Sequence, residues 1–451
     1  MAQSQARTPN RWAIVTAGTI VMICLGTVYS WSIFTRPLIA SQGWSNATTT
    51  WAFAIAIFFL GIGAVIGGRW QDAAGPRVVT VTGVALWGFG YLLAGLGTHA
   101  LGPWWLYLTY GVIGGLGNGM AYITPVATVT KWFPDMRGFA SGAVVMGFGL
   151  GAFFYNQVVT RIPSFAAAAA HATGYVAAKD AAAKAHTPFD VSTLPADAIL
   201  TQADAASIFA VFVVSGIVFI IVGVLCALLL SNPPAGYRLT SAVAVAAHAG
   251  RDFTPGEVLR THQFYLLWLM LFLNVTAGIL IISNAVPIYS DLTGATAAVA
   301  GAVYGFLAIF NGIGRFFWGA VSDRIGRNAA YVLIFAIQVV VFGALGHLHD
   351  FATVGIAFAI VLLCYGGGFG TMPSFNADYF GTRYLGANYG MIITAWGCAG
   401  IVGPVLAAFV KDRTGSFTGA LMPVAIMLLV AAILPLITRK PAAATAATAA
   451  R

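Results

Sequence analysis

The sequence predicts an all-α membrane protein of twelve transmembrane helices, built as two pseudo-symmetric halves of six helices each. Composition is the first observation behind this prediction: hydrophobic residues make up 59% of the 451 residues and charged residues only 8%. A soluble domain needs about 25% charged residues to cover its surface. The second observation is that the apolar residues fall in runs of about 20, the length with which a helix crosses about 30 Å of hydrocarbon.

Twelve such runs follow one another along the chain. The six in the N-terminal half are expected near 12–34, 47–68, 78–98, 103–130, 138–160 and 207–231. The six in the C-terminal half are expected near 264–287, 296–319, 329–348, 353–377, 386–409 and 418–438. The expected units are an N-terminal half (1–231), a cytoplasmic linker (232–263), a C-terminal half (264–440) and a disordered tail rich in alanine and threonine (441–451). The first run is too long for the core of a signal peptide, so we expect it to stay in the mature protein.

An internal repeat is the third observation. The stretch "GRWQDAAGPR" begins at Gly68 and "GAVSDRIGRN" at Gly319, which places Asp72 and Asp323 251 residues apart. A second pair, "GFASGAVVMGFGLGA" and "GANYGMIITAWGCAG", lies 248 residues apart. Two echoes at nearly the same offset indicate two homologous halves in parallel orientation.

The basic residues predict the orientation. Counted over the loops, the end that carries both termini collects most of the lysines and arginines, as the positive-inside rule requires of the cytoplasmic side. Both termini are therefore expected in the cytoplasm, and the membrane is expected to be the inner membrane of a bacterium. The same bias accounts for the net charge of +9, so nothing in it indicates nucleic-acid binding.

The two charged stretches resemble the loop signature G-x-x-x-D-x-x-G of the major facilitator superfamily, and the resemblance covers essentially the whole chain. Within that superfamily, "GTVYSWSIFTRPL", "KWFPDMRGFASG", "LNVTAGILIIS" and "CYGGGFGTMPSFNADYFG" are similar to the oxalate/formate antiporter family, which is related to the monocarboxylate transporters. The resemblance implies that Asp72, Arg77, Asp323 and Arg327 act as a conformational latch between the halves. The alternative is that these turns only fix the topology.

Arg315 is the one charged residue that falls inside an expected span, where a charge costs several kcal/mol and indicates function. Asn311 precedes it by four residues and so shares its helical face. Gly312 and Gly314 leave room for a ligand or for a neighbouring backbone. A guanidinium matches a carboxylate with two parallel hydrogen bonds, which predicts an anionic carboxylate as the bound group. The alternative is that Arg315 reaches the interface or pairs with the cluster around Asp323.

The resemblance favours substrate binding, because related monocarboxylate carriers keep an arginine on the eighth helix as the substrate anchor. Members that carry oxalate are expected to add a lysine on the eleventh helix, where this chain has Cys398 and Ala399. One cation suits one carboxylate, so lactate, pyruvate, acetate or formate is preferred over oxalate. Further expected cavity residues are Tyr29, Trp31, Tyr122, Asn274, Tyr365 and Trp396.

Other classes of function find no support in the motifs. The glycine-rich stretches "GVIGGLGNG" and "GGGFG" follow no expected strand, and the four cysteines lack the spacing of a metal site. We therefore expect no metal, no cofactor and no enzymatic activity, and a monomer embedded in the lipid bilayer. The predicted function is secondary active transport of a small monocarboxylate by alternating access, as proton symport or anion exchange. An oxalate/formate-type exchanger and a carboxylate-binding membrane sensor remain the alternatives.

Overall fold

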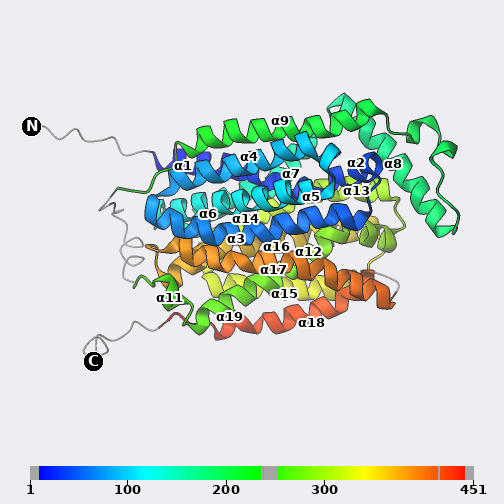
Figure 1. The fold of residues 1–451 in the computed structure, drawn as a ribbon. Helices are drawn as coiled ribbons and strands as arrows, with labels where there is room; N and C mark the ends of the chain where they lie inside the picture. The colour runs from blue at the N-terminus through cyan, green and yellow to red at the C-terminus, as the bar shows by residue number, and fades with distance from the viewer. Residues whose placement is uncertain (1–9, 235–236, 238–250, 415–416, 442–451) are drawn as a thin grey trace, which may run out of the picture.

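The computed structural model describes residues 10–234, 237, 251–414 and 417–441. Over these residues the chain is helical, and the long helices run side by side as one bundle (Figure 1). Most of the predicted linker, residues 235–236 and 238–250, lies outside the described residues. So do residues 442–451 of the predicted tail.

The N-terminal half supplies six crossings. The first is assembled from α1 (Arg11–Gly26), the 3-10 turn η1 (Thr27–Ser30) and α2 (Ser32–Gln42), and the fourth from α5 (Pro103–Leu106), the π-helical η2 (Tyr107–Gly114) and α6 (Gly115–Trp132). The others are α3 (Asn46–Ala74), α4 (Pro76–Leu101), α7 (Arg137–Val159) and α9 (Gln202–Ala227). The alanine-rich segment between α7 and α9 forms α8 (Pro163–Lys184), η3 (Val191–Thr193) and η4 (Ala196–Ala198).

The C-terminal half repeats this arrangement. After α11 (Pro255–Val258) come α12 (His262–Thr293), the pair α13 (Ala297–Leu307) and α14 (Ile309–Ile325), and α15 (Arg327–Leu345). They are followed by α16 (Phe351–Phe380), α17 (Leu385–Thr414), η5 (Phe417–Ala420), and the pair α18 (Leu421–Ala431) and α19 (Ile433–Ile437).

Twelve crossings match the predicted number. Among the described residues, eleven helical segments are long and apolar enough to span a membrane. The twelfth crossing is the continuous α5–η2–α6 segment, residues 103–132. Several helices outrun the predicted spans: α3 ends at Ala74 instead of residue 68, and α16 at Phe380 instead of residue 377. Asp72 and Asp378 consequently lie on the helix ends themselves and not in the turns that follow.

Glycines set the contact between the halves. A Cβ at Gly68 of α3 would overlap the carbonyl oxygen of Gly386 in α17, and a Cβ at Gly319 of α14 would overlap that of Gly138 in α7. These four glycines are the repeated ones, so the two echoes of the sequence meet each other across the interface. Backbone contact this close is how membrane helices gain packing energy where lipid offers no hydrophobic drive.

Candidate functional site

Arg315 lies on α14 between the two halves and is 0% exposed. Its Nε donates a hydrogen bond of 3.1 Å to Oδ1 of Asn311, one turn earlier on the same helix. The space beside the two glycines is used by neighbouring helices: Gly314 faces the backbone of Leu363 in α16, and Gly312 faces Leu150 in α7. The glycines therefore let α14 approach both neighbours so closely that Arg315 is buried.

Two phenylalanines, one from each half, flank the guanidinium. Its central carbon lies 5.3 Å from the ring centroid of Phe148 on α7 and 4.6 Å from that of Phe369 on α16. Both distances suit a cation–π interaction, which is stronger where water is excluded. With its Nε bound to Asn311 and its plane held between two rings, the side chain of Arg315 is fixed in one orientation.

Four more aromatic side chains complete what we call the aromatic cage. Its members are Tyr29 of η1, Tyr122 of α6, Phe148 of α7, Tyr365 and Phe369 of α16, and Trp396 of α17. The hydroxyls of Tyr29 and Tyr365 hydrogen-bond at 2.7 Å, joining the N-terminal and C-terminal halves. Trp396 is central, with ring centroids 5.5 Å from Tyr122, 5.3 Å from Phe148 and 4.8 Å from Phe369.

The site is a buried cation with unused hydrogen-bond donors. Nη1 and Nη2 of Arg315, the hydroxyl of Tyr122 and Nε1 of Trp396 are all buried without a hydrogen-bond partner. The hydroxyls of Tyr29 and Tyr122 lie next to the guanidinium and interact with it, although neither forms a hydrogen bond of ordinary length and angle with Nη1 or Nη2. No carboxylate among the described residues forms an ion pair with Arg315. Because an uncompensated charge is costly in a low-dielectric interior, this arrangement is suited to a small anion that accepts two parallel hydrogen bonds.

Most of the residues expected at the cavity meet here. Arg315, Asn311, Tyr29, Tyr122, Tyr365 and Trp396 form one cluster. Trp31 lies apart, because its Nε1 donates to the carbonyl of Thr49 and its ring stacks on Tyr110. Asn274 contacts the cage through its backbone: its Nδ2 donates a hydrogen bond of 3.1 Å to the carbonyl oxygen of Tyr365.

Sequence reasoning missed Phe148 and Phe369. Phe148 had a usable signal, because it occupies the position of the N-terminal echo that corresponds to Trp396, 248 residues later. The sequence signal for Phe369 was weaker: it lies one helical turn after Tyr365 and so shares the same face of the helix. The position in the N-terminal half that corresponds to Arg315, 251 residues earlier, is Ala64. Of these two corresponding positions, only the one in the C-terminal half carries a cation.

The two repeated aspartates each cap a helix of the opposite half. Asp72 accepts hydrogen bonds from the backbone N–H groups of Gly386 (3.3 Å) and Ala387 (2.8 Å) at the start of α17. Asp323 accepts them from Gly138 (2.9 Å) and Phe139 (2.8 Å) at the start of α7. A carboxylate at a helix N-terminus satisfies free N–H groups and interacts favourably with the helix dipole.

Arg327 lies in an ion network with these caps, whereas Arg77 does not. Arg327 pairs with Asp323 at 2.7 Å and with Asp378 at 2.9 Å, and Arg137 of the other half also contacts Asp378 at 2.9 Å. Arg77 is exposed and has no ion pair in the described part of the chain; Lys131 takes the place beside Asp72, at 3.3 Å. We call the end of the bundle that holds this network the charged end. It is closed in this structure.

Among the described residues, no three His, Cys, Asp or Glu side chains are grouped so that they could hold a metal ion. The four cysteines are free thiols on helices.

Comparisons with known proteins bear on the family and the fold of the chain. A family model described as Major Facilitator Superfamily matches residues 16–159 and 198–404. The chain is 29% identical over 424 residues to the oxalate:formate antiporter of Oxalobacter formigenes, covering 93% of this chain and 90% of that protein. It is 26% identical to apicoplast pyruvate carrier 1 of Toxoplasma gondii, covering 85% and 81%. The crystal structure of the transporter FucP in the outward conformation superposes with a TM-score of 0.67 at 16% identity, over 95% of this chain and 100% of FucP.

Proposed function

The chain belongs to the major facilitator superfamily, and from that premise we propose that it is a secondary carrier of a small monocarboxylate. Lactate, pyruvate, acetate and formate are the candidate substrates. The superfamily consists of transporters and not of enzymes, and the relatives at 29% and 26% identity are named for oxalate, formate and pyruvate. All of these are small carboxylates.

The observation that carries the proposal is the unpaired guanidinium of Arg315. Its Nη1 and Nη2 are buried without a partner while its Nε is held by Asn311. A carboxylate that accepts from both nitrogens neutralises the charge and satisfies both donors at once. The hydroxyl of Tyr122 and Nε1 of Trp396 are the further donors that we assign to substrate recognition.

A single cation in the site favours a substrate with one carboxylate over a substrate with two. The charged side chains buried among the described residues are Arg137, Asp204 and Arg315, and Arg137 is engaged with Asp378 at the charged end. Ala399, one turn after Trp396 on the same face of α17, carries no charge for a second carboxylate. The oxalate:formate antiporter relative keeps oxalate exchange as the second candidate.

The transport cycle starts here from a state in which the charged end is closed. We assign the charged end to the cytoplasmic side, with both termini there, because the basic residues gather at that end. Release of substrate into the cytoplasm then requires the Asp72 and Asp323 caps to separate from α17 and α7. The empty carrier holds an unpaired charge in its interior, whereas the loaded carrier holds a neutralised pair, so the loaded form changes conformation more readily. This asymmetry favours exchange of one anion for another over net symport with protons.

Transport into proteoliposomes tests the proposal. Purified protein is reconstituted with and without internal lactate, formate or oxalate, and uptake of each labelled anion is followed. We expect monocarboxylate uptake that internal monocarboxylate accelerates. Uptake of oxalate alone would support the dicarboxylate alternative, and uptake of none of the three would reject carboxylate transport and leave a sensor role.

A further inference from the structure

A long apolar groove runs along the outside of the N-terminal half, away from Arg315. Its floor is formed by α1 and η1, and its walls by α7 and α9. It has a volume of about 410 Å³ and extends along α9 from Ser207 to Val222. At 1.5 Å per residue this is about 22 Å of helix.

The walls of the groove face the surroundings of the bundle. On α7, Phe154 and Val158 are 47% and 65% exposed, and on α9, Val214 and Val218 are 58% and 44% exposed. These residues lie on membrane-crossing segments, so the surroundings are lipid. We propose that the groove binds one acyl chain of an anionic phospholipid, with the headgroup held at its outer end by Arg161.

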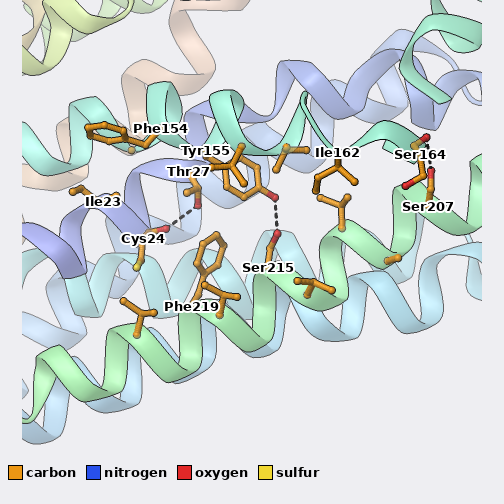
Figure 2. Close-up of a pocket in the computed structure, with 18 residues that line it drawn as sticks. Ile23, Cys24, Thr27, Phe154, Tyr155, Ile162, Ser164, Ser207, Ser215 and Phe219 are labelled. Atoms are coloured by element: carbon orange, nitrogen blue, oxygen red, sulfur yellow. Dashed lines mark hydrogen bonds between the residues drawn. The ribbon is translucent and has the colours of Figure 1, made fainter. Parts of the chain in front are cut away.

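The polar groups of the groove exclude a small polar ligand such as the substrate. Figure 2 shows the hydroxyls of Tyr155 and Ser215 meeting across the groove, at 2.7 Å, and Thr27 turned back onto the carbonyl of Cys24, at 2.8 Å. Each of these three hydroxyls is satisfied within the protein, so the middle of the groove offers hydrocarbon to a ligand. One leaflet of the bilayer is about 15 Å deep, half of the hydrocarbon core. The groove is therefore long enough to hold a whole acyl chain.

Charge at the outer end selects the headgroup. There Ser207 donates to the carbonyl of Ser164, as Figure 2 shows at the right. Arg161 is exposed in the turn after α7, one residue before Ile162 of the groove lining, with Nη1 donating to the carbonyl and to the side-chain Oε1 of Gln157. Asp204, three residues before Ser207, is buried and engaged by Thr201 and by His171 at 2.9 Å. The chain therefore carries an exposed cation next to the outer end of the groove, where an anionic headgroup would find an opposite charge.

Occupancy of the groove connects to the substrate site through the helices that form it. Tyr29 of the aromatic cage is on η1 and Phe148 is on α7, and both elements also line the groove. An acyl chain would fill the space between α7 and α9, which the Tyr155–Ser215 hydrogen bond and the ring contact between Tyr155 and Phe219 bridge. The lipid would hold α7 against α1.

Native mass spectrometry of the purified full chain tests the proposal, with phosphatidylglycerol and phosphatidylcholine of identical acyl chains as probes. We expect one tightly bound phosphatidylglycerol. Arg161→Gln is expected to weaken its binding about fivefold, the equivalent of about 1 kcal/mol for one basic residue near an anionic lipid, while leaving phosphatidylcholine unaffected. Arg36→Gln, an exposed arginine on α2, is the charge control.

A groove-filling variant provides the second arm. Val214→Trp places an indole in the groove without entering the core and is expected to abolish tight binding of both lipids. Val340→Trp, at a 70% exposed position on α15, is the control and should leave binding unchanged. The thermal unfolding midpoint of each variant checks the fold. Equal binding of both lipids that neither Arg161→Gln nor Val214→Trp reduces would overturn the proposal, as would a protein dimer that Val214→Trp dissociates.

Discussion

Replacing Arg315 with glutamine separates the two roles that a buried arginine can have. In the substrate role, Nη1 and Nη2 gain a carboxylate only when substrate binds, because both lack a partner in this structure. Removing one member of such a buried pair costs about 3–5 kcal/mol of the free energy that holds the pair together. Arg315→Gln is therefore expected to weaken carboxylate affinity by a factor of at least about 100.

The stability of the empty protein should hardly change. Loss of the charge relieves the burial of an arginine at membrane depth, about 3 kcal/mol. Loss of the contacts with Phe148 and Phe369 removes about 1–2 kcal/mol each. The gain and the loss nearly cancel, so the variant should unfold within about 1 kcal/mol of the unmodified protein.

Two measurements on the same preparation test this reasoning. Uptake of labelled lactate and formate into proteoliposomes reports the binding role, and the thermal unfolding midpoint with and without substrate reports the structural role. We expect Arg315→Gln to lose uptake and the substrate-dependent rise of the midpoint, with the midpoint of the empty protein preserved. Arg36→Gln, at an exposed position on α2, is the matched control. Near-normal uptake by Arg315→Gln, or a large fall in the midpoint of the empty protein, would refute the anchor assignment.

Three further changes probe the cage, the caps and the specificity. Phe148→Leu frees the Arg315 side chain, so the Kd for carboxylate should rise about fivefold, the effect of ordering one long side chain on binding; Phe89→Leu on the lipid-facing surface of α4 should leave it unchanged in the same titration. Asp323→Asn weakens the charge-assisted cap of α7 by about 1–2 kcal/mol, so distances between spin labels on the two halves at the charged end should lengthen. Asp350→Asn, which weakens a cap inside one half, should not change them. Ala399→Lys should add oxalate to the transported anions; continued monocarboxylate uptake without any oxalate uptake would contradict the role given to that position.

Much of the architecture was readable from local properties of the sequence. Run length and composition predict membrane helices because the requirement to cross a fixed thickness of hydrocarbon acts on each segment separately. The duplicated Asp72 and Asp323 stretches revealed the two halves, since an internal repeat needs no knowledge of contacts. Helix ends were less readable: α3 and α16 run past the apolar runs because a helix continues into water wherever its backbone hydrogen bonds can continue.

The proposed site around Arg315 also combines features that a single helix determines with features that the packing of several helices determines. The sequence by itself determined that one arginine lies within an expected span and that Asn311 shares its face, because helical periodicity fixes neighbours within one element. That Arg315 is buried and does not reach the interface was decided by the tertiary structure. Which side chains meet Arg315 from other helices was decided only by the packing of α7 and α16 against α14. Phe148 and Phe369 became its neighbours because Gly312 and Gly314 let three backbones approach. The tertiary structure also decided that Lys131 and not Arg77 stands beside Asp72. Arg77 follows Asp72 by only five residues, but its side chain is exposed, whereas the packing of the helices brings Lys131 from a distant part of the sequence to the carboxylate.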